Sequence, residues 1–195
     1  MRDNKLKIML IDEQPQRFAL LEDSLLPYGH EIVARVSASD DLIEAVEKAQ
    51  PDVIIIDLDT PGRDTLEHMQ TISRDRPRPI VMFTNDGDNA TIERAVKAGV
   101  SAYVVDGLSP ERIRTVLDVA IHRFREFQLL REELEQTRNQ LAERKLVEKA
   151  KGILMKKRDL DEERAYQVLR KMAMDRNLKL ADLARSLIAA ADLLD

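Results

Sequence analysis

Short, mostly apolar runs alternate with stretches of helical period through roughly the first 120 residues. The apolar runs occupy residues 7–11, 30–36, 53–56, 80–83 and 102–105, and helix-period stretches such as 18–22 and 41–46 lie between them. Strands that are apolar on both faces and separated by helices are typical of a parallel sheet covered on both sides. The pattern therefore predicts one doubly wound α/β domain of flavodoxin-like type with five parallel strands. In such a domain the functional site lies at the carboxyl ends of the strands.

A much longer helical stretch follows this domain. It begins at Ser109, a favourable N-cap, with Pro110 in the first helical position. No further Gly or Pro occurs before Gly152, which predicts an extended, coiled-coil-like linker helix over residues 109–145. A heptad frame places at its a and d positions Leu117, Ala120, Phe124, Phe127, Arg131, Leu134, Arg138 and Leu141. This seam favours a homodimer or an intramolecular helix contact, with a solvent-exposed connector helix as the alternative.

The pattern at the end of the chain predicts three short amphipathic helices. The first covers residues 146–154, and the second begins after the N-cap residue Asp161 and ends near Asn177. The second and third have apolar faces formed by Ala165, Val168, Leu169, Met172 and Ala173, and by Leu180, Leu183, Ala184, Leu187 and Ile188. Three such helices form a small all-α bundle. Met155, Met172 and Met174 are expected to fill its core.

Composition limits the compartment and the chemistry. The chain of 195 residues contains no Cys, which excludes a disulfide framework, a thiolate metal site and a cysteine nucleophile. No apolar run approaches the ~18 residues of a membrane-spanning helix, and the N-terminus lacks a signal-peptide pattern. We therefore expect a soluble, cytoplasmic protein that does not contact a membrane.

The formal net charge of −5 hides an uneven distribution. Residues 1–142 carry 18 basic and 26 acidic side chains, whereas residues 143–179 carry 12 basic and 7 acidic ones. A basic cluster on a small helical bundle is typical of a nucleic-acid-binding surface, although basic runs also occur simply as solvated helix faces.

Polar side chains follow three of the predicted strands. Asp12 and Glu13 follow the first strand, Asp57 and Asp59 follow the third, and Thr84 ends the fourth. Clustered carboxylates suit a hard divalent cation such as Mg²⁺, which takes oxygen ligands and retains several waters. A metal ion beside a carboxylate neutralises the oxygens of a phosphoryl group. The sequence thus predicts a Mg²⁺-assisted phosphoryl site, with Asp12, Glu13, Asp57 and Asp59 as candidate metal ligands.

This ordered set resembles the receiver domain of two-component response regulators over residues 1–122. The resemblance implies that Asp57 is the phosphoacceptor and that Asp12 and Glu13 form the acidic pair at the Mg²⁺ site. It also implies that Thr84 and Tyr103 are the switch residues, the hydroxyl that follows the phosphoryl group and its aromatic partner. The domain has no catalytic turnover of its own in this interpretation, and a histidine kinase is the expected sensor partner.

One position departs from the receiver pattern. Receivers carry Lys followed by Pro shortly after the switch aromatic, and this chain has Asp106 followed by Gly107. The substitution replaces a cation that contacts the phosphoryl group with a like charge, and Asp86 and Asp88 lie in the neighbouring loop. At a few Å such repulsion is worth on the order of 1 to 4 kcal/mol. A pseudo-receiver adaptor that is switched by a partner protein is therefore an open alternative to phosphorelay control.

The C-terminal motifs, Ala150-Lys151-Gly152-x-Leu154-Met155 followed by Ala165-Tyr166-x-x-Leu169-Arg170-x-x-Ala173-Met174, resemble the ANTAR RNA-binding domain, here over residues 134–195. A receiver, a long helix and an ANTAR bundle form the layout of ANTAR antiterminators, which bind stem-loops in leader RNA. The Asp106 replacement and this layout resemble the NasT type, which regulates nitrate and nitrite assimilation under a nitrate-sensing partner. Candidate RNA contacts are Lys149, Lys151, Tyr166, Arg170 and Lys171. A DNA-binding response regulator is the main alternative, although no convincing recognition helix is present.

Overall fold

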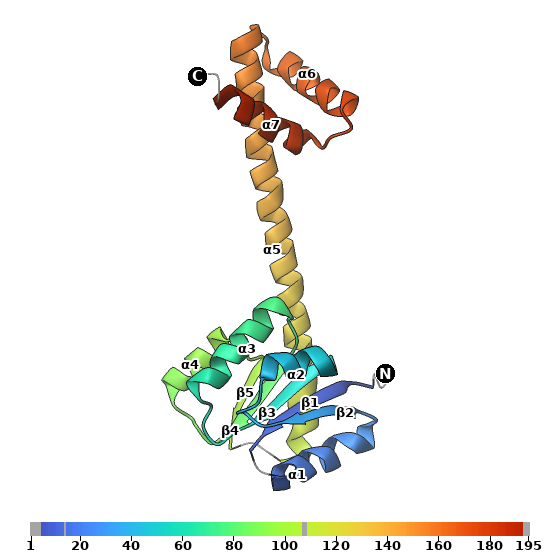
Figure 1. Cartoon of the computed structure of the whole chain (residues 1–195), viewed down its shortest axis with the longest axis vertical. Coiled ribbons are helices and arrows are strands. Elements are labelled where there is room, and N and C mark those ends of the chain that lie inside the picture. The colour runs from blue at the N-terminus through green and yellow to red at the C-terminus, as the bar shows by residue number, and fades with distance from the viewer. Residues whose placement is uncertain (1–4, 14, 107–108, 193–195) are drawn as a thin grey trace. The chain divides into compact units, whose positions relative to one another are not determined.

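The computed structural model describes residues 5–13, 15–106 and 109–192. These residues form two compact units, and the boundary between the units along the chain falls between Gln128 and Leu129. The first unit contains a five-stranded parallel sheet with the strand order β2-β1-β3-β4-β5, so that β1 and β3 lie at its centre (Figure 1). The predicted receiver fold is therefore confirmed.

The sheet and helices of the first unit alternate along the chain. Their bounds are β1 (Lys7–Asp12), α1 (Pro15–Leu25), the 3-10 helix η1 (Leu26–Tyr28), β2 (Glu31–Val36), α2 (Leu42–Ala49), β3 (Val53–Asp57), α3 (Arg63–Asp75), β4 (Ile80–Thr84), α4 (Asn89–Lys97) and β5 (Ala102–Val105). A sixth helix, α5 (Pro110–Arg158), begins in this unit and continues into the second one.

Two separate cores hold the helices against the sheet. On one face, alternate strand residues such as Met9 and Ile54 pack with α2, α3 and α4. On the other face, Leu10 and Ile55 pack with α1 and with the first turns of α5. Alternation of this kind follows from the two-residue period of a strand, since successive side chains point to opposite faces. Because both faces are covered, the strands β1, β3 and β4 are apolar along almost their whole length.

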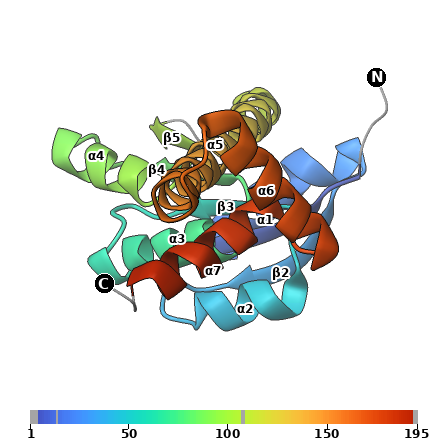
Figure 2. The ribbon, with the colours of Figure 1, turned by 90° about the horizontal axis from the view of Figure 1, so that it is seen from above.

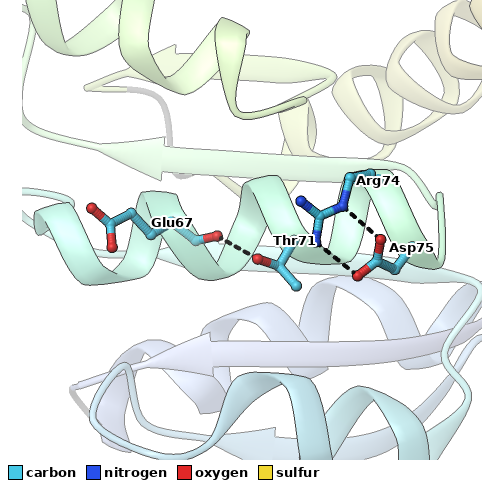
Figure 3. A network of polar contacts seen from close by, with 4 residues as sticks. All are labelled: Glu67, Thr71, Arg74 and Asp75. Atoms are coloured by element: carbon cyan, nitrogen blue, oxygen red, sulfur yellow. Dashed lines mark hydrogen bonds and ion pairs between the residues drawn. The ribbon is translucent and has the colours of Figure 1, made fainter.

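Local polar contacts fix where several helices begin and how their outer faces meet water. The Asp41 carboxylate accepts hydrogen bonds from the first turn of α2, and Asp88 caps α4 in the same way. On the solvent face of α3, the Arg74 guanidinium contacts Asp75, and the Thr71 hydroxyl donates a 3.1 Å hydrogen bond to the Glu67 carbonyl (Figure 3). Exposed ion pairs of this type contribute little to stability, typically about 0 to 1 kcal/mol. The apolar face of α3, rather than this network, therefore holds it in place.

The second unit contains the end of α5 together with α6 (Glu162–Asp175) and α7 (Leu180–Asp192). Figure 2 shows α6 and α7 beside the last turns of α5. Ala150 and Leu154 of α5 pack with Leu169 of α6 and Ala184 of α7 in a single apolar core. The predicted bundle is confirmed, and Asp161 caps α6 by accepting a 2.8 Å hydrogen bond from the Arg164 amide.

Helix α5 corrects two details of the prediction. It runs unbroken over 49 residues, so the first bundle helix is the end of the linker helix and not a separate short element. The predicted seam is wrong at Leu117 and Ala120. Both residues are buried in the core between α5 and the sheet, so they are unavailable to a partner helix. Farther along, Leu134 and Leu141 are 51% and 54% exposed. Only this later part of the heptad pattern remains open to a second copy of the chain.

Among residues 5–13, 15–106 and 109–192, no helix combines the length and the apolar character that crossing a bilayer requires.

Candidate functional site

Two carboxylates lie next to each other at the edge of the sheet that is formed by the carboxyl ends of its strands. Asp12 ends β1 and Asp57 ends β3, and the two residues are direct neighbours in the register of these strands. Each is only 2% exposed. One oxygen of each carboxylate, Oδ2, is buried without a hydrogen-bond partner among the described residues, although both residues have other polar or electrostatic contacts. Buried carboxylate oxygens in this arrangement are suited to a cation.

The carboxylates at this edge suit a Mg²⁺ ion that takes only a few of its ligands from the protein. Within the part of the chain that the structure describes, no cluster of three or more acidic or histidine side chains converges on one point. Mg²⁺ is commonly held by one or two carboxylates, with waters and phosphate oxygens completing its shell. Asp12 and Asp57 supply two such carboxylates. Of the other two predicted ligands, Glu13 is exposed, and Asp59 accepts a 2.8 Å hydrogen bond from the Asn85 amide.

The two predicted switch residues both contact the loops at this edge. The Thr84 hydroxyl donates a 2.9 Å hydrogen bond to the Asp59 carbonyl and accepts one of 3.1 Å from the Asp86 amide. The half-buried Tyr103 donates its hydroxyl hydrogen to the Asp86 carbonyl at 2.8 Å. Burial raises the pKa of the Tyr103 phenol, so the ring stays a neutral donor at physiological pH. These bonds connect β4 and β5 to the loops after β3 and β4.

Asp106 lies at the end of β5, next to the same edge. Its amide donates a 3.1 Å hydrogen bond to the Thr84 carbonyl, and its side chain is exposed. Its φ angle of 49° lies in the left-handed region, which Asp and Asn tolerate better than most other side chains. The structure thus joins the backbone of this acidic residue to that of the switch threonine. Gly107, the second residue of the departure from the receiver pattern, lies outside the described residues.

Most of the predicted RNA contacts lie on the surface of the second unit. Lys149 is exposed on α5, and Tyr166, Arg170 and Lys171 are exposed on α6. Tyr166 retains 42% of its surface in solvent, enough to present one face of its ring. A base stacks on an exposed aromatic face, and cations contact the phosphates.

Lys151 differs from the other four. Its side chain is only 9% exposed, and its ammonium group lies 2.7 Å from both the Glu148 and the Glu162 carboxylates. The hydrogen bonds to Glu148 and Glu162 raise the pKa of Lys151, and the bond from Lys151 lowers that of Glu162. Contact with RNA stays a prediction for this residue. Its position gives it a structural task, since it connects α5 to the first turn of α6.

This connection has a defined pH window. The contribution of Glu162 is present above its unfolded pKa, near 4.5, and is lost as the pH falls through its lower folded value. The contribution of Lys151 is present below about pH 10.5 and is lost as the pH rises through its higher folded value. The contact is therefore intact at neutral pH.

Removing the carboxylate tests the connection. We expect Glu162→Gln to speed amide hydrogen exchange in α6 at pH 7, because the α6 N-terminus loses its link to α5. Glu163→Gln is the matched control, since Glu163 also lies in the first turn of α6 and interacts equally with the helix dipole. Exchange measured by mass spectrometry should leave Glu163→Gln close to the unmodified protein. Equal acceleration in both variants would show that the dipole, and not Lys151, is responsible.

The structure also exposes one residue that the sequence analysis predicts in the core. Met174 was expected to fill the core but is 70% exposed, so this prediction is wrong. Its spacing gives the reason: Tyr166, Arg170 and Met174 recur every four residues, one position beyond the buried row that contains Leu169. At Gly152 an added Cβ would meet no atom within 4 Å, so this position of α5 is not closely packed within the bundle.

Both units match known families. Residues 8–118 match the response regulator receiver domain, and residues 135–188 match the ANTAR domain. The transcriptional regulatory protein PdtaR of Mycobacterium tuberculosis is 34% identical over 164 residues, which cover 84% of this chain and 80% of that protein. The nitrate regulatory protein of Klebsiella oxytoca is 39% identical over 83 residues, 43% of this chain and 21% of that protein.

Solved structures agree with the fold of the first unit. A LuxR-family response regulator from Aurantimonas sp. SI85-9A1 superposes with a TM-score of 0.54 at 23% identity, covering 61% of this chain and 86% of that one. With the receiver match over more than half of the sequence and a relative that spans most of it, the chain belongs to the response regulators that join a receiver domain to an ANTAR domain.

Proposed function

We propose that this protein is an RNA-binding transcription antiterminator whose receiver domain controls its ANTAR domain. The proposal rests on one observation, the presence of a receiver and an ANTAR domain in a single chain. Members of this family are regulators rather than enzymes. In this role the ANTAR unit binds stem-loops in leader mRNA and prevents a terminator hairpin from forming.

The charge of the second unit supports binding to RNA. The exposed cations Lys149, Arg170 and Lys171 suit phosphate oxygens, and the ring of Tyr166 suits an unpaired loop base. RNA stem-loops offer both chemistries together, because their loops contain bases that are not stacked in a helix. Binding that depends on several phosphate contacts should weaken steeply with salt.

Nitrate and nitrite assimilation is the proposed pathway. Its support is the similarity to the nitrate regulatory protein, which covers 43% of this chain, together with the acidic residue at Asp106. The proposed sensor is a nitrate-sensing partner protein, with a histidine kinase as the alternative. Control by protein contact suits a receiver whose phosphoryl site has gained a negative charge.

Phosphorylation of Asp57 remains the second proposed route of control. The proposal is supported by the place of Asp57 at the end of β3 and by the pairing of Asp57 with Asp12, which we propose as its partner in holding a Mg²⁺ ion. Bound there, the ion would neutralise the oxygens of the incoming phosphoryl group. The hydrogen bonds of Thr84 and Tyr103 to the loops after β3 and β4 support their proposed role of passing on a change at Asp57.

A homodimer is the proposed assembly for binding paired stem-loops. Leu134 and Leu141 lie seven residues apart on α5 and are exposed, as a self-complementary helix seam requires. Two ANTAR units held together would bind two loops with the advantage of effective concentration.

Crosslinking the protein to RNA in its own cells and sequencing the bound fragments tests the proposal and identifies the target. We expect stem-loops from leader regions, including those of nitrate assimilation genes. The recovered transcript and the duplex DNA of the same sequence should then be compared in gel shifts. We expect tighter binding to the transcript, because loop bases are available only there. Preference for the duplex would favour the DNA-binding alternative, and binding to neither would favour the adaptor.

A further inference from the structure

Gly152 occupies an unusual place in helix α5. It lies six residues before the end of a helical segment that is continuous from Pro110 to Arg158. Glycine inside a helix is less favourable than alanine by about 1 kcal/mol, because it loses more backbone freedom and covers less of the backbone. Such a residue is usually retained for close packing, for a left-handed backbone or for the approach of a ligand.

Within one copy of the chain, the structure shows neither of the first two reasons. A Cβ at Gly152 would meet no heavy atom within 4 Å, so no neighbouring helix requires the missing side chain. The residue is not among those with positive φ. Ala150 and Leu154, which pack in the core, are each two positions away and therefore lie on nearly the opposite side of the helix. Gly152 thus bares the backbone of α5 on the side that faces away from the bundle core.

Lysines surround this bare segment. Lys145, Lys149 and Lys156 are exposed and are spaced with Gly152 at intervals of four, three and four residues. This spacing places all four residues along one face of the helix, in a stripe about 16 Å long at 1.5 Å per residue. We call this face the glycine notch. Within it, the half-buried Gly152, which has no side chain, lies between long cationic side chains.

We propose that the glycine notch is where the phosphodiester backbone of the bound RNA lies against α5. The absence of a side chain at Gly152 lets the strand approach the helix to van der Waals distance, while Lys145, Lys149 and Lys156 contact its phosphates. This inference rests on the proposed RNA-binding function and adds to it a location and a steric requirement. Local sequence choices that weaken a helix without a packing benefit are typical of functional sites.

The test separates stability from binding. Gly152→Ala should leave the thermal midpoint of the full-length protein unchanged or raise it, because alanine favours helix and the space is open. The same variant should bind the crosslinked stem-loop transcript about tenfold more weakly, since the added methyl group holds the strand away from the helix. Gly152→Leu should weaken binding further. Ala190→Leu, which adds the same bulk at an exposed position of α7 outside the notch, is the matched control and should bind like the unmodified protein.

The lysines give a second readout. Lys156→Gln should reduce the slope of the logarithm of the binding constant against the logarithm of salt concentration by about one. Lys48→Gln removes the same charge from α2 of the receiver and should leave that slope unchanged. Unchanged RNA affinity in both Gly152 variants would overturn the proposal and leave the notch to a protein partner. Equal losses in Gly152→Leu and Ala190→Leu would also overturn it. Should the unmodified protein itself fail to bind the transcript, the proposed function fails first and this inference with it.

Discussion

Replacing Asp106 by lysine is expected to speed phosphorylation of Asp57 by about ten- to a thousand-fold. Two unit charges about 4 Å apart interact by about 1 kcal/mol in water and about 4 kcal/mol at an effective dielectric constant of ~20, and each 1.36 kcal/mol changes a rate tenfold. In the native sequence Asp106 follows β5 and its backbone amide bonds to the Thr84 carbonyl, so we expect its carboxylate to lie near the site where an incoming phosphoryl group adds negative charge. Labelling with acetyl phosphate in the presence of Mg²⁺, followed by intact-protein mass spectrometry, measures the change.

Two further variants isolate the cause. Asp106→Asn removes the charge but keeps a side chain that tolerates the φ angle of 49°, so it should produce a smaller acceleration without backbone strain. Asp57→Asn should abolish labelling in every background. Rapid, stoichiometric labelling of the native protein would show that Asp106 does not obstruct the site. Control by phosphorelay would then be favoured over control by a partner protein.

Removing Arg170 and Lys171 together is expected to weaken stem-loop binding by about a hundred-fold at physiological salt. Both are exposed on α6, and loss of two phosphate contacts should also reduce the salt slope by about two. Filter binding of the crosslinked transcript across a salt series, with alanine at both positions, checks affinity and slope together.

The control for this double variant is Arg123→Ala with Arg125→Ala. Both arginines are exposed on the part of α5 that belongs to the first unit, and their loss changes the net charge by the same amount. If binding depends only on overall charge, the two double variants will lose affinity equally, and the surface proposed on α6 will be wrong. A loss confined to Arg170 and Lys171 supports a local interface.

The strand pattern predicted the receiver fold well because a sheet buried on both faces leaves a strong signal. The runs at 7–11 and 53–56 fall inside β1 and β3, and the carboxylates after them meet because parallel strands align their carboxyl ends. The heptad pattern was less informative. Leu117 and Ala120 repeat at the spacing of a coiled coil, yet the same spacing suits a helix that packs on a sheet. Only the position of the sheet distinguishes the two.

The ANTAR surface was harder to predict from composition. Lys151 and Lys149 are equivalent in charge and differ by two positions, so no compositional argument distinguishes them. The structure separates them because Lys151 is nearly buried between Glu148 and Glu162, and Lys149 is exposed. Glu162 follows Lys151 by eleven residues and reaches it only after the chain has turned between α5 and α6. Contacts of this kind depend on the turn geometry, which a helical period does not specify.

The exposure of Met174 has a chemical consequence. A thioether that is 70% in solvent is open to peroxide, whereas Met9, Met69 and Met82 are completely buried. Oxidation to the sulfoxide makes the side chain polar, and it disrupts protein cores only where the sulfur is packed. Oxidation of Met174 would leave the bundle intact. It would change the exposed face of α6 that also contains Tyr166 and Arg170. Oxidation would therefore change the proposed RNA-binding surface of this regulator before it changed the fold.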